Sequence, residues 1–279
     1  MNPAQREYRS SSPTPVNDSQ RWQLTADRYR SGRQMDPVLA DHFRRVHLDL
    51  VRRWVQPGTQ GLILKTDVFA EATCPSRAFS WELAGAGELV YVDISTRLTR
   101  QARAHAASLG YGDSVYTVAD VRHLPFATDT FDLIVSDSTL DHFGNRADIH
   151  VALRELARVL RPGGTLVITL DNPRNVTQPL LSLWLRLGLA PYFIGATLSR
   201  KELETALADM HLDVIQSAVI LHQARFFTKA ALRLMRATKV PGGERLARAG
   251  LAPSERLARW PSCELTGLFV AACAVKPPR

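Results

Sequence analysis

The strongest constraint on the fold is an alternation of short apolar runs and helical segments between residues 61 and 171. The apolar runs have the length of strands and end at polar residues, while apolar residues three and four apart mark the helices between them. Strands that alternate with helices of this length form βαβ units, which build a parallel sheet with helices on both faces. The sequence therefore predicts a doubly wound α/β fold, with strands at 62–64, 88–95, 114–120, 131–138 and 165–171.

Helix end signals support this reading. Asp36-Pro37 starts the first helix, and Ser199 followed by Glu202 forms a capping box at the last. Residues 162–164, Pro-Gly-Gly, are expected to stop another helix. The predicted helices cover 35–55, 71–83, 96–110, 147–164 and 199–212, and two further strands at 213–221 and 265–275 close the sheet.

The chain divides into a flexible N-terminal arm over residues 1–34 and one domain over 35–279. The start of the arm, residues 1–20, is polar and rich in Ser, Pro, Arg and Asn, with no apolar signal segment. The remainder contains enough apolar residues to bury a sizeable core, since 45% of the whole chain is hydrophobic. Two inserts, at about 176–198 and 222–260, are expected to cap the site of the domain.

The first insert contains an apolar stretch, residues 179–198, that is long enough to span a bilayer. Arg186 lies near its middle, which costs roughly 2.5–3.5 kcal/mol in a membrane, and Pro191 interrupts the helix. We therefore expect a lid or a shallow membrane contact and no membrane span.

The second insert is basic and amphipathic. Phe226 and Phe227 lie among Arg225, Lys229 and Arg233, in a chain with a net charge of +8. This pattern predicts contact with an anionic membrane or with a lipid-linked or phosphorylated substrate, although a solvated helix face fits it equally well. Nucleic acid is a less favoured partner because no RNA-binding motif or aromatic stacking platform is present. The oligomeric state and the pathway are left open.

The three cysteines, Cys74, Cys263 and Cys273, are odd in number and widely spaced. They show no metal-ligand spacing, so no metal site is predicted. Reduced thiols of this kind are typical of a cytoplasmic protein.

Polar residues follow nearly every predicted strand. The carboxyl ends of parallel strands meet at one edge of a sheet, where ligands bind. One acidic residue at a strand end usually caps a helix or closes a turn, but five successive polar strand ends indicate a shared site. A carboxylate at Asp93 suits the two hydroxyls of a ribose, and Asp120 with a backbone N–H suits a purine edge. The strand-end residues are Lys65, Asp67, Asp93, Asp120, Ser136, Asp137, Asp171 and Asn172.

Three segments resemble successive motifs of class I S-adenosylmethionine-dependent methyltransferases: "LVYVDIST", "VADVRHLPFATDTFDLIVSDSTLDHF" and "LRELARVLRPGGTLVITLDNP". The resemblance covers roughly residues 55–170. It implies a seven-stranded, mostly parallel Rossmann-like sheet whose last strand, 265–275, is antiparallel. It also implies S-adenosylmethionine as the cofactor. The residues that would hold it are Asp93 and Ile94 at the ribose, Asp120 and Val121 at the adenine, and Ser136 near the reactive end.

The stretch "GLILKTDVFAEA", residues 61–72, departs from the first motif of this family, an acid followed by Gly-x-Gly. Lys65 takes the place of the acid, and Asp67 and Phe69 replace the glycines, whose missing Cβ lets the backbone approach the cofactor. The cofactor then binds in a shifted pose, with Lys65 at its carboxylate and Asp67 at its amine, or the fold has lost methyl transfer and binds another nucleotide or an anionic substrate. Lys65 can also simply pair with Asp67 or Asp93, but we expect a ligand role because buried charges are costly without partners.

Methyl transfer needs alignment and sometimes a base. The candidate bases are Asp137, Asp141 and His142, although His142 also suits a packing role. Asp171 and Asn172 are expected to bind substrate, or else to form an Asx turn.

The sequence thus favours an S-adenosylmethionine-dependent methyltransferase acting on a small-molecule or lipid-like acceptor. The alternative is an enzyme of this fold with non-methylating chemistry, such as cyclisation or elimination. A basic nucleic-acid-binding module is the third possibility.

Overall fold

A computed structural model describes residues 18–30, 35–55, 61–187, 193–223, 225–238 and 241–278. Its centre is a seven-stranded sheet in the order β3-β2-β1-β4-β5-β7-β6. Neighbours from β3 to β5 pair in parallel, and β7 runs antiparallel between β5 and β6. The predicted fold class is confirmed. The strands are β1 (Gly61–Thr66), β2 (Gly87–Asp93), β3 (Val115–Val118), β4 (Phe131–Asp137), β5 (Leu160–Asp171), β6 (Asp213–His222) and β7 (Gly267–Val275).

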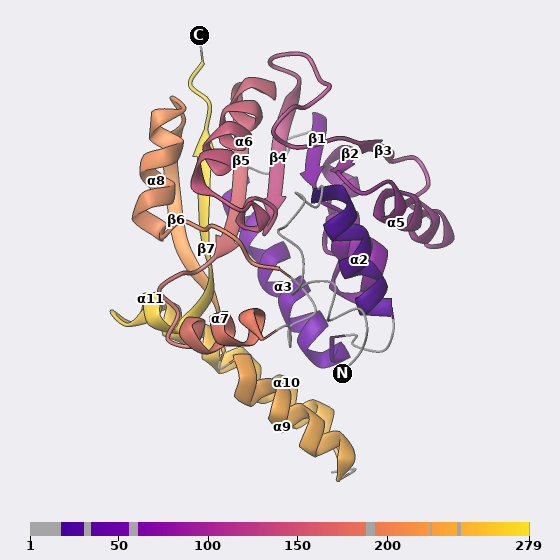
Figure 1. Cartoon of the computed structure of the whole chain (residues 1–279), viewed down its shortest axis with the longest axis vertical. Helices are drawn as coiled ribbons and strands as arrows, with labels where there is room; N and C mark the ends of the chain where they lie inside the picture. The colour runs from indigo at the N-terminus through magenta and orange to yellow at the C-terminus, as the bar shows by residue number, and fades with distance from the viewer. Residues whose placement is uncertain are drawn as a thin grey trace.

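Helices cover both faces of this sheet (Figure 1). Two consecutive residues of β1 show the division, because Ile63 packs into one buried cluster and Leu64 into the other. The first cluster includes Leu39 of α3 and Leu98 of α5, and the second includes Leu153 of α6. The helices are α2 (Asp18–Arg30), α3 (Pro37–Trp54), α4 (Phe69–Thr73), α5 (Thr96–Ser108), α6 (Arg146–Val159), α7 (Gln178–Arg186), α8 (Arg200–Asp209), α9 (Arg225–Ala237), α10 (Gly243–Leu251) and α11 (Cys263–Thr266).

The helix start signals in the sequence work as predicted. The Asp36 carboxylate accepts a hydrogen bond from the Val38 N–H at 2.9 Å, at the start of α3. Ser199 and Glu202 form the reciprocal capping box at the start of α8. These bonds satisfy backbone donors that have no partner inside the helix.

Two helices are shorter in the structure than the sequence predicted. In place of a helix over 71–83, α4 ends at Thr73 and Pro75 opens a 3₁₀ turn, followed by a second 3₁₀ segment at Ser80–Ala86. Proline lacks the N–H that an α-helix interior requires. The helix predicted over 147–164 ends at Val159, and its Pro-Gly-Gly sequence lies inside β5, where the Gly163 N–H donates to the Lys276 carbonyl.

The N-terminal arm also differs from its prediction. Residues 1–17 lie outside the described residues, but Asp18–Arg30 form the helix α2 rather than a flexible arm. Asp18 binds the Arg122 guanidinium at 2.9 Å, and the Trp22 ring packs edge-on against the rings of Phe69 and His142. Interactions with residues a hundred positions away therefore order this polar segment, and its local composition gives no sign of them.

The two inserts lie together beyond one end of the sheet. Figure 1 shows α7, α9 and α10 at the end of the molecule opposite the C-terminus, and the rings of Trp184 in α7 and Phe226 in α9 are in contact, with centroids 5.1 Å apart. Residues 188–192, which follow α7 in the chain, are outside the part that the structure describes. Among the described helices, none is both long and apolar enough to cross a membrane.

Candidate functional site

A cavity opens where β1, β2, β4 and β5 end, at the edge of the sheet where the sequence predicted a shared site. Its walls also include residues of α2, α3 and α9, so segments far apart in the sequence enclose it. Most of the predicted site residues line this cavity: Asp67, Asp93, Ile94, Asp120, Val121, Asp137, His142 and Asp171.

Four predicted site residues do not line the cavity. Lys65, Ser136 and Asp141 are almost completely buried beside it. The Ser136 hydroxyl accepts a hydrogen bond from the Thr66 hydroxyl, which joins β4 to β1. The Asn172 amide donates to the carbonyls of Glu264 and Gly267, so this side chain ties the end of β5 to the start of β7.

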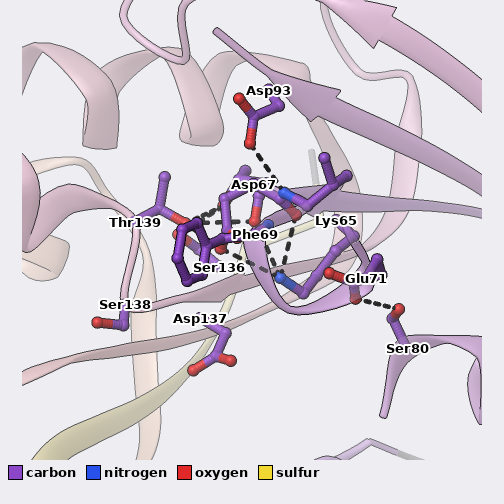
Figure 2. A network of polar contacts seen from close by, with 12 residues as sticks. Lys65, Asp67, Phe69, Glu71, Ser80, Asp93, Ser136, Asp137, Ser138 and Thr139 are labelled. Carbon is purple, nitrogen blue, oxygen red and sulfur yellow. Dashed lines mark hydrogen bonds and ion pairs between the residues drawn. The ribbon is translucent and has the colours of Figure 1, made fainter. Parts of the chain in front are cut away.

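The turn after β1 is held by Lys65 from below (Figure 2). The Lys65 ammonium lies 3.0 Å from the Thr66 carbonyl oxygen and 3.3 Å from both the carbonyl and the carboxylate of Asp67. The Asp67 carboxylate also accepts from the Phe69 N–H and from the Thr139 hydroxyl. The turn is therefore fixed by a network of charges and hydrogen bonds.

The backbone at Asp67 is left-handed, with φ of 62°. Glycine reaches this conformation without strain, whereas most other residues avoid it and Asp tolerates it better than most. The turn thus keeps the backbone conformation of a glycine while adding a carboxylate that faces the cavity.

Lys65 carries a charge in the interior. Burial acts to lower its pKa, but the carboxylates of Asp67, Glu71 and Asp137 raise the pKa above its usual value, so the side chain remains a cation. Burial raises the pKa of Glu71, against the opposing effect of Lys65. Ser80 donates a 2.5 Å hydrogen bond to Glu71. A lysine stands where the first motif of the resembled family has an acid. Its positive charge offsets the negative charges of Asp67, Glu71 and Asp137.

Asp93, at the end of β2, is 7% exposed. Its two carboxylate oxygens accept hydrogen bonds from the N–H groups of Val68, at 3.0 Å, and Ser95, at 2.7 Å. Burial and the nearby Asp67 charge raise the pKa of Asp93 to about 7, although the two N–H donors and Lys65 work in the opposite direction. Each oxygen keeps a second lone pair for a hydroxyl donor in the cavity.

Asp120 is held by Arg122, whose guanidinium binds both of its carboxylate oxygens. Burial works to raise the pKa of Asp120, but the bonds to Arg122 lower it below its usual value. The same guanidinium binds Asp18 of α2 and Asp148 of α6 and stacks over the Phe143 ring. Arg122 therefore links the predicted adenine side of the cavity to the N-terminal helix.

His142 follows β4 in a 3₁₀ turn and reaches the cavity. Its Nδ1 lies 2.6 Å from the Phe193 carbonyl, which can only accept, so Nδ1 carries a hydrogen and the neutral ring has its lone pair on Nε2. Nε2 lies 3.7 Å from the fully buried Asp141 carboxylate, whose pKa is raised to about 6 by burial and by Asp171, despite the opposing effect of His142. Asp141 also accepts from the Asp171 N–H, so it holds His142 and the end of β5 together.

His47 is a site residue that the sequence analysis missed. Its Nδ1 donates to the Phe43 carbonyl, one turn earlier in α3, and its Nε2 lies 3.0 Å from the Asp137 carboxylate. Burial acts to raise the pKa of Asp137, but His47, Lys65 and Arg77 together hold it well below its usual range. Asp137 is therefore an ionised group in the cavity wall. Only the helical periodicity of 35–55, which places position 47 on the buried face, signals this role.

One wall of the cavity is apolar. Leu39 and Phe43 of α3, Trp22 of α2, Phe143, and Phe269 of β7 line it. Carboxylates lie among these apolar side chains, because Asp171 pairs with Phe269 across β5 and β7 and Arg122, which binds Asp120, lies over the Phe143 ring. Such a lining suits a ligand that combines polar, cationic groups with apolar ones.

These side chains fit S-adenosylmethionine. Ribose hydroxyls match the lone pairs of the Asp93 carboxylate, and a cationic sulfonium and ammonium match the excess of acids among the lining residues. The methionine half would share its space with the Asp67 carboxylate, which must either bind it or move.

Residues 71–168 match a family described as a methyltransferase domain. Ubiquinone/menaquinone biosynthesis C-methyltransferase UbiE of Haemophilus ducreyi is 34% identical over 110 residues, which are 39% of this chain and 41% of that protein. The matched region thus spans about two fifths of that relative's length. The family match begins just after the turn at 65–69, in agreement with the altered first motif.

Two solved structures share the fold. The [4+2]-cyclase SpnF has a TM-score of 0.56 at 17% identity, covering 85% of this chain and 81% of that chain. Geranyl diphosphate C-methyltransferase from Streptomyces coelicolor A3(2), in complex with Mg²⁺, geranyl diphosphate and S-adenosyl-L-homocysteine, has a TM-score of 0.55 at 15% identity, covering 83% and 79%. The chain shares the fold of these structures, and its residues 71–168 match a methyltransferase domain. Both findings support the predicted class I S-adenosylmethionine-dependent methyltransferase superfamily, in which S-adenosylmethionine is the cofactor.

The buried charge of Lys65 gives a testable prediction. Lys65→Met removes the cation that balances Asp67, Glu71 and Asp137, and stranding buried carboxylates should lower the free energy of unfolding by roughly 3–5 kcal/mol. Urea denaturation followed by circular dichroism measures the loss. The matched control is Lys201→Met, at an exposed position of α8, which should change stability by less than about 0.5 kcal/mol. A similar small effect from both substitutions would contradict the role of Lys65 as counter-charge.

Proposed function

We propose that the chain is a methyltransferase that uses S-adenosylmethionine and acts on a small-molecule or lipid-like acceptor with a large apolar part. The observation that carries the proposal is the cavity itself, which is lined by Asp93, Ile94, Asp120 and Val121 together with the apolar wall. The family match of residues 71–168 supports the same reaction class.

In this proposal Asp93 holds the ribose hydroxyls and Asp67 binds the ammonium of the cofactor's methionine part. The bound cofactor supplies an electrophilic methyl group on a sulfonium. The protein's own work is to hold the acceptor against the apolar wall in line with that methyl group, and to exclude water. Trp22 of α2 lies in the cavity wall, so the N-terminal helix shields the site from solvent.

His142 is the proposed base where the acceptor must lose a proton. The hydrogen bond from Nδ1 to the Phe193 carbonyl leaves the Nε2 lone pair for that proton. Asp141, 3.7 Å from Nε2, is placed to stabilise the imidazolium that forms. Asp137 and Asp171, also in the cavity wall, are proposed to orient polar groups of the acceptor.

The relatives support an apolar acceptor. The name of the Haemophilus ducreyi relative refers to quinone biosynthesis, and the Streptomyces coelicolor enzyme binds geranyl diphosphate. Both acceptor classes combine a polar head with an isoprenoid chain. The aromatic and aliphatic wall formed by Phe43, Phe143 and Phe269 suits such a molecule.

A second candidate is non-methylating chemistry, such as cyclisation or elimination, in the same fold. The observation that favours it is the carboxylate of Asp67 at the position of a conventional glycine, because it restricts the space for the methionine part of the cofactor. An acceptor bound against the same apolar wall would then react without methyl transfer.

Binding of S-adenosylhomocysteine, measured by calorimetry, tests the proposed cofactor site. Asp93→Ala should weaken binding by about 1.5–3 kcal/mol, the usual contribution of hydrogen bonds to a charged group. Circular dichroism should show an unchanged fold. Equal affinity of the variant and the original protein would remove Asp93 from the site.

The raised pKa of Asp93 adds a pH dependence to this test. Hydroxyl donors favour the ionised carboxylate, so binding below pH 7 must release a proton from Asp93. Affinity should therefore fall about tenfold per pH unit below pH 7 and reach a plateau above it. Asp93→Asn should flatten the profile, and an unchanged slope in this variant would assign the titration to another group.

Substitutions at Asp67 separate the two candidate functions. Asp67→Gly suits the left-handed backbone and removes only the side chain, whereas Asp67→Asn keeps its shape without the charge. If Asp67 binds the cofactor's ammonium, both variants should bind S-adenosylhomocysteine at least about tenfold more weakly. Tighter binding by Asp67→Gly alone would show that the carboxylate obstructs the cofactor, in favour of the second candidate.

His142→Asn tests the proposed base. This variant should bind S-adenosylhomocysteine normally but transfer a labelled methyl group to prenylated hydroquinones and phenols about 10²–10⁴-fold more slowly. His150→Asn, on α6, is the control and should keep full activity. Equal rates in both variants would exclude His142 as the base.

A further inference from the structure

An apolar stripe lies exposed on α7. Leu180, Leu183, Trp184 and Leu187 follow the i, i+3, i+4, i+7 spacing of one helix face, and they are 46%, 51%, 41% and 52% exposed. Leu181, beside this stripe, is 2% exposed and anchors α7 to the rest of the protein. Large apolar side chains gathered in this way mark a contact surface.

A second stripe with the same spacing lies on α9. Phe227 and Leu234 are 77% and 65% exposed, and Ala230 and Ala231 lie exposed between them. The two helices meet where the Trp184 ring contacts the Phe226 ring. Together these stripes of α7 and α9 form what we call the insert face.

Positive charge is concentrated in the same part of the chain. Residues 225–260 contain nine Lys and Arg against two Asp and Glu, so this segment holds +7 of the chain's net charge of +8. Ion pairs neutralise some of these cations, such as Arg236 with Asp36 and Arg248 with Asp41. Exposed guanidinium groups remain in this segment, at Arg233 of α9, Arg245 of α10, and Arg256 and Arg259 beyond it.

The insert face is also connected to the cavity. Lys229 of α9 lies in the cavity wall, two residues from the exposed Phe227. The insert face and one part of the cavity wall therefore belong to the same helix, α9.

We propose that the insert face docks onto an anionic lipid surface, from which the lipid-like acceptor reaches the cavity. The apolar stripes enter the boundary between headgroups and acyl chains, and the arginines attract the negative headgroups. A protein partner explains apolar side chains alone equally well, but the +7 charge of the adjoining segment favours the membrane. This inference deepens the proposed function, since it rests on the lipid-like acceptor proposed there.

Co-sedimentation of the full chain with vesicles tests the proposal. The protein should bind phosphatidylcholine vesicles that contain phosphatidylglycerol, bind pure phosphatidylcholine vesicles more weakly, and lose the difference in high salt. Leu183→Glu and Phe227→Glu should each weaken binding about tenfold or more, the effect of losing one buried Leu or Phe side chain.

Leu109→Glu is the matched control, because Leu109 is 54% exposed at the end of α5, on a different part of the surface. This control should bind vesicles like the original protein. Absence of binding to anionic vesicles, or equal loss in all three variants, would overturn the proposal. Light scattering that shows a dimer broken by Leu183→Glu would overturn it too, because a second copy of the chain would then cover the insert face.

The vesicle assay needs no cofactor, so its outcome is independent of the proposed reaction. Leu183→Glu should bind S-adenosylhomocysteine with unchanged affinity. Vesicle binding by a protein that binds no S-adenosylhomocysteine would retain the docking surface and reject the methyltransferase proposal.

Discussion

The site depends on the buried ammonium of Lys65. This one cation lies beneath the turn after β1, holds two backbone carbonyls and the Asp67 carboxylate, and lowers the energy of the acids around it. Without it, the charges of Asp67, Glu71 and Asp137 would lack their shared counter-ion, although Glu71 is almost completely buried. In the resembled family the same turn relies on the small size of glycine. Here an electrostatic network takes the place of that steric solution, which leaves a charged carboxylate at the cavity.

Much of the architecture could be predicted from the sequence, because the relevant signals are local. The strands and helices that the periodicity predicts and the caps at Asp36 and Ser199 are present. The antiparallel last strand, which the family resemblance implied, is present too. The predictions were wrong where contacts between distant segments determine the local structure. The Gly163 N–H donates to the Lys276 carbonyl as part of the sheet, although Pro-Gly-Gly is a typical helix stop. The helix α2 is held in place by Arg122 and by the rings of Phe69 and His142.

The site was predictable only in part, for a similar reason. Strand ends are recognisable in the sequence, and the predicted site residues Asp67, Asp93, Asp120 and Asp171 line one cavity. The partners of those residues come from other segments. His47 looks like any polar residue on the buried face of a helix until Asp137 is found 3.0 Å away. The lining role of Trp22 depends on the position of a whole helix.

The bonds of Arg122 make the N-terminal helix part of the binding equilibrium. Asp120, in the cavity, and Asp18, on α2, share this one guanidinium. A ligand group that draws Asp120 away changes what Arg122 offers to Asp18, and linkage requires the reverse effect to be equally large. The affinity of the cavity therefore depends on any change that strains or releases the first helix. Changes in α2 that break the Asp18–Arg122 ion pair are accordingly expected to alter ligand affinity at the cavity, even where they leave the strand ends untouched.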